Sequence, residues 1–251
     1  MDSNGSGIGR ALALGISIAV GLAVGGFLIG NGFYRARVQE RYVTVRGLVE
    51  RPVRADVAVW SIAYSATGDD VSKANEQIES DRKLVYAFAL AHGFPASEIE
   101  PIPTRVTDRS SWGGEQIRTA GRYLVTGGIR IRSTRVEQVQ QASQLTGELI
   151  RQGVVLSLES QGANANPAYF YTKLDSIRPA ILAEATKSAR AVADQFARDS
   201  KSRLGPIRRA NQGVFEITGR DSADSRNPMT EQSSIDKTVR LVSTIQYYLE
   251  N

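Results

Sequence analysis

The sequence contains no cysteine and only one histidine, His92, in 251 residues. Without cysteine the chain can form no disulfide and no thiolate nucleophile, although proteins of oxidising and of reducing compartments both occur without it. A single histidine and no thiol also leave a zinc site short of ligands at workable spacing. We therefore interpret His92, which precedes Gly93, as the cationic end of a helix, and we expect no metal and no cofactor.

A concentrated charge of one sign is lacking as well. The 31 lysines and arginines exceed the 26 aspartates and glutamates by only five, and the positive charges are dispersed. Basic and aromatic residues nowhere alternate in the way that a nucleic-acid-binding surface requires. We therefore expect that nucleic acid is not a partner. The composition, 41% hydrophobic and 23% charged residues, is that of a folded protein rather than a disordered one.

One segment has no charged residue at all, and it runs from Ala11 to Tyr34. As a helix it is long enough to cross about 30 Å of hydrocarbon. The alternative, a cleaved signal peptide, fits less well, because the apolar run exceeds an ordinary signal core and residues 29–32 make a poor cleavage site. We predict an uncleaved anchor, with residues 1–10 in the cytoplasm, 11–34 in the membrane and 35–41 beside it.

Glycine is frequent inside this apolar segment. Two pairs have the small-xxx-small spacing that lets helix backbones approach closely in a membrane, Gly21 with Gly25 and Gly26 with Gly30. We name these four glycines as candidates for a helix–helix contact between anchors. The alternative is the ordinary glycine content of membrane helices.

Beyond the anchor, hydrophobic periodicity predicts alternating strands and helices. Strands are expected near residues 42–48, 56–67, 102–109, 123–132, 154–158, 214–217 and 239–249. Helices are expected near 70–91, near 136–152 and from 166 or 176 to 200, and residues 219–234 are expected to form a mobile loop. The order β-β-α-β-β-α-β-α-β-β predicts an α+β fold, with a largely antiparallel sheet and helices packed against it.

Local patterns predict where some of these elements begin and end. Asp69 and Asp70 suit the N-terminus of a helix, where negative charge is favourable. Arg51-Pro52 suits a break after the first strand. Thr134 and Glu137 have the spacing of a capping box, which would open the next helix.

One strand and the long helix have distinct faces. In the strand near 123–132, Arg130 and Arg132 share the face opposite the apolar residues, and Gly127-Gly128 predicts a bulge or a close backbone approach. Glu184 and Lys187 are expected on the exposed face of the helix. Its opposite face, read at 3.6 residues per turn, is expected to be buried and comprises Ile181, Ala185, Ala189, Val192 and Phe196.

Two patterns invite an enzymatic interpretation. Ser234-Ile235-Asp236-Lys237 has the Ser-x-x-Lys spacing in which a lysine activates a serine nucleophile, but it lies between a polar loop and a strand, so we interpret it as a chance match. Asp69-Asp70 and the pair Asp221 and Asp224 could serve acid–base chemistry or calcium. The first pair suits a helix N-terminus, and the second has no coordinating glycine turn. We therefore predict no catalytic residue.

Three consecutive aromatic residues, Tyr169, Phe170 and Tyr171, are the candidate for a partner contact. They cannot all face inward on one helix, so at least one ring is expected to be available to a partner. The alternative is that all three pack in the core and at its rim, where aromatic residues commonly join a helix to a sheet.

Four stretches of the chain, taken in order, resemble the SIMPL-domain family of bacterial envelope proteins. They are Tyr42-Val43-Thr44-Val45-Arg46-Gly47 with the following Ala55-Asp56-Val57-Ala58, Pro179 through Phe196, Ala210-Asn211-Gln212-Gly213-Val214-Phe215, and Lys237-Thr238-Val239-Arg240 through Tyr248-Leu249. The likeness covers about residues 40–250, so residues 42–251 are taken as one SIMPL-like domain. Lys201 stands where relatives are expected to carry glycine.

The resemblance implies a mixed α/β domain, an envelope location, homo-oligomers and a mostly unassigned function, with no catalytic residues to carry over. Arginines follow the anchor, so charge alone would place the domain in the cytoplasm, whereas the resemblance favours the periplasm. We therefore expect a single-pass inner-membrane protein whose partners are membrane lipid and further copies of itself.

The expected role is that of a non-enzymatic interaction or self-assembly module. One alternative is an envelope hydrolase that uses Ser234 and Lys237. Another is a small-ligand-binding protein, which would need a pocket beside residues 169–171.

Overall fold

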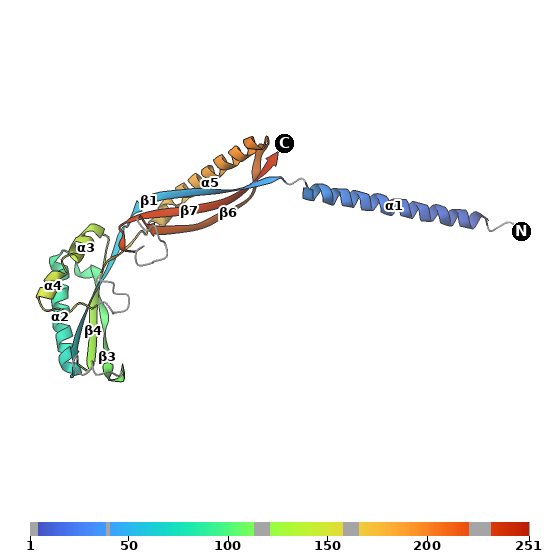
Figure 1. Cartoon of the computed structure of the whole chain (residues 1–251). Coiled ribbons are helices and arrows are strands. Elements are labelled where there is room, and N and C mark those ends of the chain that lie inside the picture. Colours follow the sequence, from blue (N-terminus) through green and yellow to red (C-terminus); the bar gives the residue numbers. More distant parts are fainter. Residues whose placement is uncertain (1–4, 39–40, 113–120, 158–165, 221–231, 251) are drawn as a thin grey trace. The chain divides into compact units, whose positions relative to one another are not determined.

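The computed structural model describes residues 5–38, 41–112, 121–157, 166–220 and 232–250. The chain divides into two compact units, and most of their elements are labelled in Figure 1. Unit 1 comprises Met1–Leu48, Glu184–Gly213 and Val242–Asn251, and unit 2 comprises Val49–Ala183 and Val214–Leu241. Each unit is therefore assembled from segments that are distant in the sequence.

Unit 2 is built around a four-stranded sheet with the order β3-β4-β2-β5. β4 pairs antiparallel with β2 and β3, and β5 pairs antiparallel with β2. One helix connects β2 to β3 and two short helices connect β4 to β5, which is the β-α-β-β-α-β arrangement of ferredoxin-like folds. The elements are β2 (Val57–Gly68), α2 (Val71–Ala91), η1 (Ala96–Glu98), β3 (Ile99–Asp108), η2 (Arg109–Trp112), β4 (Tyr123–Ser133), α3 (Val136–Ser143), α4 (Gly147–Arg151) and β5 (Ala168–Phe170).

One face of this sheet is covered by α2 and carries the core of unit 2. Alternate positions of β2 and β4 are almost fully buried there, namely Trp60, Ile62, Tyr64, Ile129 and Ile131. The face of α2 predicted from its period is confirmed, with Ala74, Ile78, Val85 and Phe88 buried. The N-terminus of α2 is also confirmed, because the Asp70 carboxylate accepts hydrogen bonds from the N–H groups of Ser72 and Lys73.

The opposite face of the sheet carries Arg130 and Arg132, as predicted, and both side chains are exposed. They lie beside Ser61 and Val59 of β2 in the antiparallel register. Because one face is packed under a helix and the other is polar, the sheet has the alternation expected of an antiparallel sheet with one open side.

Gly127 and Gly128 mark a close approach of backbones rather than a bulge. Every residue of β2 from Ala58 to Gly68 has a partner in β4, and a Cβ added at Gly128 would lie 2.9 Å from the carbonyl oxygen of Ile62. The register shift of this sheet lies instead in β3, between Ile102 and Arg105.

A second sheet has three strands in the order β1-β7-β6. These are β1 (Tyr42–Arg54), β6 (Arg203–Gly219) and β7 (Asp236–Glu250), and each of them, like α5 (Leu174–Asp199), continues from one unit into the other along the chain. In unit 1, α5 lies along one face of this sheet (Figure 1). The core there consists of Val45, Ile245 and Tyr247 packed against Ala189 and Ala193.

The buried residues of α5 advance in steps of four, through Ile181, Ala185, Ala189, Ala193 and Ala197. The first three confirm the prediction, whereas Val192 and Phe196 are 40% and 54% exposed, so the prediction is wrong for these two. Each four-residue step turns the row by about 40° around the helix. Packing along such an inclined row leaves Val192 and Phe196 at its side. Glu184 and Lys187 are exposed, as predicted.

β1 continues through Arg51-Pro52, where the sequence predicts a break, and ends at Arg54. The prediction of a break is wrong because β1 is an edge strand of its sheet. A proline on an edge strand can direct its missing N–H away from the ladder, so no hydrogen bond of the sheet is lost.

The helix predicted near 136–152 is two short helices, and the predicted capping box does not form. The N-cap residue is Arg135, one position later than the pattern indicates, and it makes no side-chain capping bond. The Ser133 hydroxyl accepts a hydrogen bond from the Arg135 N–H at 3.1 Å. The interruption falls before Gly147, whose low helix propensity weakens a continuous helix.

The strand predicted near 154–158 is represented, within the described residues, by a single bridge between Leu156 and Tyr64. The fifth strand of the observed order is β5, at Ala168–Phe170. Three residues are too few for a periodic pattern, so the sequence could not reveal this strand. With it in place, the observed order of strands matches the predicted one, and the helix predicted between the fourth and fifth strands is replaced by α3 and α4.

α1 (Gly5–Val38) contains the whole uncharged segment, and its side chains are described over residues 15–31. Within the described part of the chain, no helix reaches the combined length and hydropathy of a membrane span. Most of the predicted mobile loop, residues 221–231, lies outside the described residues, and β6 ends at Gly219.

Candidate functional site

The three consecutive aromatic residues are the last two residues of β5 and the residue that follows it. Tyr169 pairs with Ala58 of β2 and is 4% exposed, so its ring belongs to the core. Burial raises the pKa of the Tyr169 hydroxyl to about 12. Phe170 points to the other face of the sheet and is 38% exposed, and Tyr171 is half-buried.

The end of β5 is held in place by Asp56, which precedes β2. The Asp56 carboxylate accepts hydrogen bonds from the backbone N–H of Thr172 at 2.6 Å and from its hydroxyl at 2.8 Å. The Asp56 N–H donates to the carbonyl oxygen of Phe170 at 2.9 Å. A three-residue strand is therefore fixed at its end by three hydrogen bonds to one residue, which also fixes where Phe170 points.

A hollow of about 630 Å³ opens beside these residues on the open face of the sheet. We call it the arginine hollow, and its lining comprises Val59, Glu100, Arg130, Arg132, Phe170, Tyr171 and Thr172. It brings the predicted partner-contact residues Phe170 and Tyr171 together with two cations, and Tyr169 lies on the opposite side of the sheet. Strand alternation predicted that the two arginines share one face of the sheet. It did not predict that β5 lies beside them.

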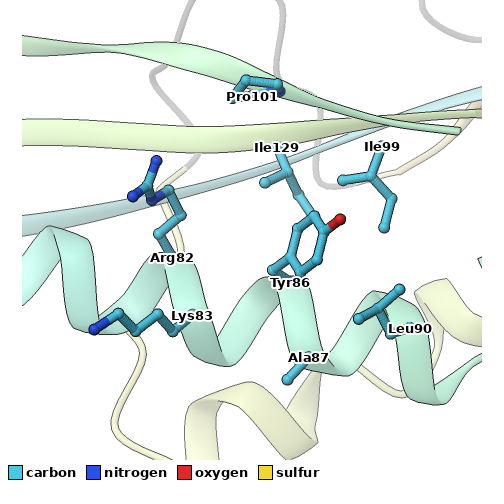
Figure 2. Close-up of a pocket in the computed structure, with 8 residues that line it drawn as sticks. All are labelled: Arg82, Lys83, Tyr86, Ala87, Leu90, Ile99, Pro101 and Ile129. Carbon is cyan, nitrogen blue, oxygen red and sulfur yellow. The ribbon is translucent and has the colours of Figure 1, made fainter. Parts of the chain in front are cut away.

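A second hollow, of about 500 Å³, lies between α2 and β3, and we call it the α2–β3 groove (Figure 2). Its lining is mainly apolar, and the Tyr86 ring stands between the helix and the strands. Arg82 and Lys83 lie at one end and Leu90 at the other. Arg82 is paired with Glu79 of the same helix. The groove offers apolar surface and one ammonium group, Lys83, to a ligand.

His92 caps the C-terminus of α2, which confirms its predicted place. Its Nε2 lies 3.3 Å from a carboxylate oxygen of Glu148 on α4, and its ring packs on Phe88 with centroids 4.3 Å apart. The contact with Glu148 joins the end of α2 to α4, whereas Phe88 belongs to α2 itself. Within the described residues, no group of three or more potential metal ligands is found.

The Ser-x-x-Lys pattern lies at the start of β7 rather than on the first turn of a helix. The Ser234 hydroxyl donates to the carbonyl oxygen of Asp236 at 2.8 Å. Lys237 is 3% exposed and belongs to β7. The local structure thus gives the serine a turn-forming role.

The carboxylate pair Asp69 and Asp70 serves the backbone. Asp70 caps α2, and Asp69 accepts a hydrogen bond from the N–H of Arg122 at 3.1 Å. Asp221 and Asp224 lie outside the described residues. The four glycines of α1, Gly21, Gly25, Gly26 and Gly30, lie within its helix, and a Cβ added at any of them would meet no other atom within 4 Å.

Sequence reasoning missed one buried carboxylate, Asp81 on α2, which is 1% exposed. Helical spacing could have predicted its burial, because residue 81 lies three residues after Ile78 and four before Val85 on the apolar face. The side-chain amide of Gln77 donates to Asp81 at 2.8 Å. Burial raises the pKa of Asp81, and the hydrogen bond from Gln77 opposes that rise.

Comparison with known proteins identifies a family and little beyond it. The family model of SIMPL, described as a protein of unknown function (DUF541), matches residues 43–245. No curated protein matches the chain. Among solved structures, an uncharacterized conserved protein from Listeria innocua is similar over 76% of this chain and 90% of that chain, with 13% identity and a TM-score of 0.19. A TM-score that low carries no argument about fold or site.

Proposed function

This chain belongs to the SIMPL family, and we propose that it is an envelope protein tethered to the inner membrane by α1. In this proposal the folded part faces the periplasm and acts by self-association and binding rather than by catalysis. The observation that carries the proposal is the exposure of apolar side chains around α1.

Between residues 15 and 31, eight large apolar side chains of α1 are each more than half exposed, namely Ile16, Ile18, Val20, Leu22, Val24, Phe27, Leu28 and Ile29. These positions are distributed around the helix rather than along one stripe, so a single protein surface could not cover them all. Leaving a side chain of this kind in water costs about 1.5–3 kcal/mol relative to burial. A lipid bilayer covers every side of a helix at once, which favours a membrane over a docking groove.

Self-association is supported by the exposed pair on α5. Val192 and Phe196 are one turn apart, so they share a patch on the side of the helix. A common anchor confines copies to one membrane plane, which raises their effective concentration and lets a small apolar patch suffice. A second copy of the chain is the occupant we propose for this patch.

Light scattering after size-exclusion chromatography of the detergent-solubilised chain tests self-association. The wild type and Lys187→Ser, an exposed change on the same helix, are expected to elute as oligomers. The double variant Val192→Ser, Phe196→Ser is expected to shift to the monomer while keeping its thermal unfolding midpoint. A monomeric wild type, or an unchanged mass for the double variant, would contradict the proposal.

The absence of cysteine gives a clean test of sidedness. Ser80 is exposed on α2, and Ser80→Cys would create the only thiol of the chain. A membrane-impermeant maleimide applied to cells with a permeabilised outer membrane is expected to label it. Labelling only after the inner membrane is lysed would place the domain in the cytoplasm, as the arginines after the anchor suggest.

The arginine hollow favours small-ligand binding as a second candidate function. It supplies the pocket beside residues 169–171 that this alternative requires. Phe170 and Tyr171 line it, together with charged groups that could orient a ligand.

A further inference from the structure

The arginine hollow contains two cations, Arg130 and Arg132, that have no ion-pair partner among the described residues. Arg130 and Arg132 alternate on β4, so both side chains leave the same face of the sheet, and their Cα atoms are separated by about 7 Å. Within the described residues, neither guanidinium takes part in an ion pair or a hydrogen bond. Two like charges held side by side raise the electrostatic potential of the hollow and favour an anion there.

One carboxylate, that of Glu100, opposes this preference. Glu100 lies opposite Arg130 in the antiparallel register of β3 and β4 and is itself exposed. The described lining has two arginines and one glutamate, so one net positive charge remains. Glu100 should therefore weaken the binding of an anion without abolishing it. Removing its charge should strengthen binding, which can be measured.

The remaining wall is aromatic and rigid. Phe170 presents an exposed ring, and Val59 contributes apolar surface from β2. The hydrogen bonds from Thr172 to Asp56 hold this wall in place before a ligand arrives. A preformed wall lowers the conformational entropy that binding must overcome.

We propose that the arginine hollow binds a small anion in which a carboxylate or phosphate group is joined to a flat apolar body. The guanidinium groups of Arg130 and Arg132 match the planar, two-oxygen edge of such acids. The ring of Phe170 offers a surface on which the flat body stacks. The volume of about 630 Å³ lies within the range of small-molecule sites.

Ligand-observed saturation-transfer NMR with the detergent-solubilised full-length chain tests this inference. Benzoate and phenyl phosphate probe the two acids, inorganic phosphate probes the acid without the flat body, and benzyl alcohol probes the flat body without the acid. Benzoate, phenyl phosphate or both are expected to bind saturably. Their binding is expected to be tighter than that of inorganic phosphate and of benzyl alcohol. Equal binding of the neutral alcohol, or no saturable binding of either acid, would overturn the proposal.

Variants connect the binding to the hollow. Arg130→Gln with Arg132→Gln is expected to weaken binding about tenfold or more, because charge-assisted hydrogen bonds are lost. Arg151→Gln removes one positive charge from an exposed position on α4, outside the hollow, and should leave binding unchanged. Glu100→Gln should strengthen binding by about two- to fivefold, since it removes the repelling charge.

The opposite signs expected at Arg130 and Glu100 keep the test decisive even if a variant alters the fold. Loss of structure would weaken binding in every case, whereas the inference requires Glu100→Gln to strengthen it. If the double arginine variant binds like Arg151→Gln, the hollow is not the site. The outcome does not depend on self-association, because Phe196 and Val192 lie on another element.

Discussion

The Cα atom of Gly47 on β1 lies directly beneath the carbonyl oxygen of Ala185 on α5, so close that a Cβ at residue 47 would overlap it. This contact explains why β1 carries glycine where it meets Ala185 and Ala189 of α5. The alanine row of α5 brings the helix backbone down onto the sheet, and only a residue without a side chain fits beneath it.

Gly47→Ala should therefore be strongly destabilising. The added methyl group meets backbone atoms, which cannot rotate aside, and overpacking of this kind costs about 1–3 kcal/mol or more. Denaturant unfolding of the detergent-solubilised chain measures the change. Gly147→Ala is the matched control, because a Cβ there lies 3.9 Å from the nearest atom, at the flexible end of Arg151. That variant should be neutral or stabilising by up to about 1 kcal/mol, since alanine favours a helix. Equal effects of the two changes would contradict the close contact.

The C-terminus of α5 ends in a left-handed residue that is not glycine. Lys201 has φ of 53°. The N–H of Ser202 donates to the carbonyl oxygen of Ala197 at 2.8 Å, and the N–H of Lys201 donates to the carbonyl oxygen of Arg198 at 3.0 Å. This is the hydrogen-bond pattern of a Schellman motif, whose left-handed position usually carries glycine. The departure from the family's expected glycine thus leaves the turn intact and strains the lysine.

Lys201→Gly should accordingly raise the free energy of unfolding by about 1 kcal/mol, since a side chain in the left-handed region costs about 1–2 kcal/mol. Lys187→Gly, in the middle of the same helix, should lower it by about 1 kcal/mol. The pair is measured by thermal or denaturant unfolding. A destabilising Lys201→Gly would show that the lysine side chain makes contacts that outweigh its backbone strain.

The buried row of α5 predicts unequal effects for two large side chains. Ile181→Ala should cost about 2–5 kcal/mol, because it empties a site that is 0% exposed. Phe196→Ala should cost less than about 1 kcal/mol in the monomer, because more than half of that side chain is already in solvent. Unfolding of both variants at low protein concentration gives the comparison. A large loss for Phe196→Ala under monomeric conditions would mean that Phe196 is covered within its own chain.

Much of this fold could be predicted from the sequence, and the misses have physical causes. The face of α2 was readable because Ile78, Val85 and Phe88 recur at helical spacing over a long element. For α5, the helical period predicted the buried face near Ile181. It did not predict that the buried row turns around the helix and leaves Phe196 exposed. The direction of that row depends on the angle at which the helix crosses its sheet, and a single sequence does not contain that angle.

The sequence predicted two parts of the candidate site separately, but not that they lie together. Strand alternation placed Arg130 and Arg132 together on one face, and the aromatic run indicated that a ring would be exposed. β5, which joins Phe170 to that face, is three residues long and is fixed by Asp56, which lies 116 residues before Thr172 in the chain. A contact of that sequence separation leaves no local pattern, so the hollow could not be predicted.

The buried carboxylate of α2 gives a prediction that depends on pH. Burial raises the pKa of Asp81 in the folded state above that in the unfolded chain, about 3.9. Such a group contributes most stability below the unfolded pKa, and this contribution is lost as the pH rises through the folded pKa. Asp81→Asn removes the charge and keeps an acceptor for the side-chain amide of Gln77. It should therefore raise the free energy of unfolding at pH 7.

The gain from Asp81→Asn should vanish below about pH 4, where the wild-type carboxyl is neutral as well. Urea unfolding at pH 7 and near pH 3 gives the comparison. Glu76→Gln, an exposed change on the same helix, should alter neither value. A loss of stability of equal size at both pH values would mean that side-chain geometry, rather than charge, decides the role of Asp81.

Carbonate extraction of membranes from cells that make the full-length chain tests the central claim, that α1 is a membrane tether. The full-length chain is expected in the membrane pellet after high salt and alkaline carbonate, with its N-terminus intact by sequencing. A chain that begins at residue 37 is expected in the supernatant, with the thermal unfolding midpoint of the full-length protein. Recovery of the full-length chain in the carbonate supernatant, or a mature N-terminus beyond residue 30, would contradict the account.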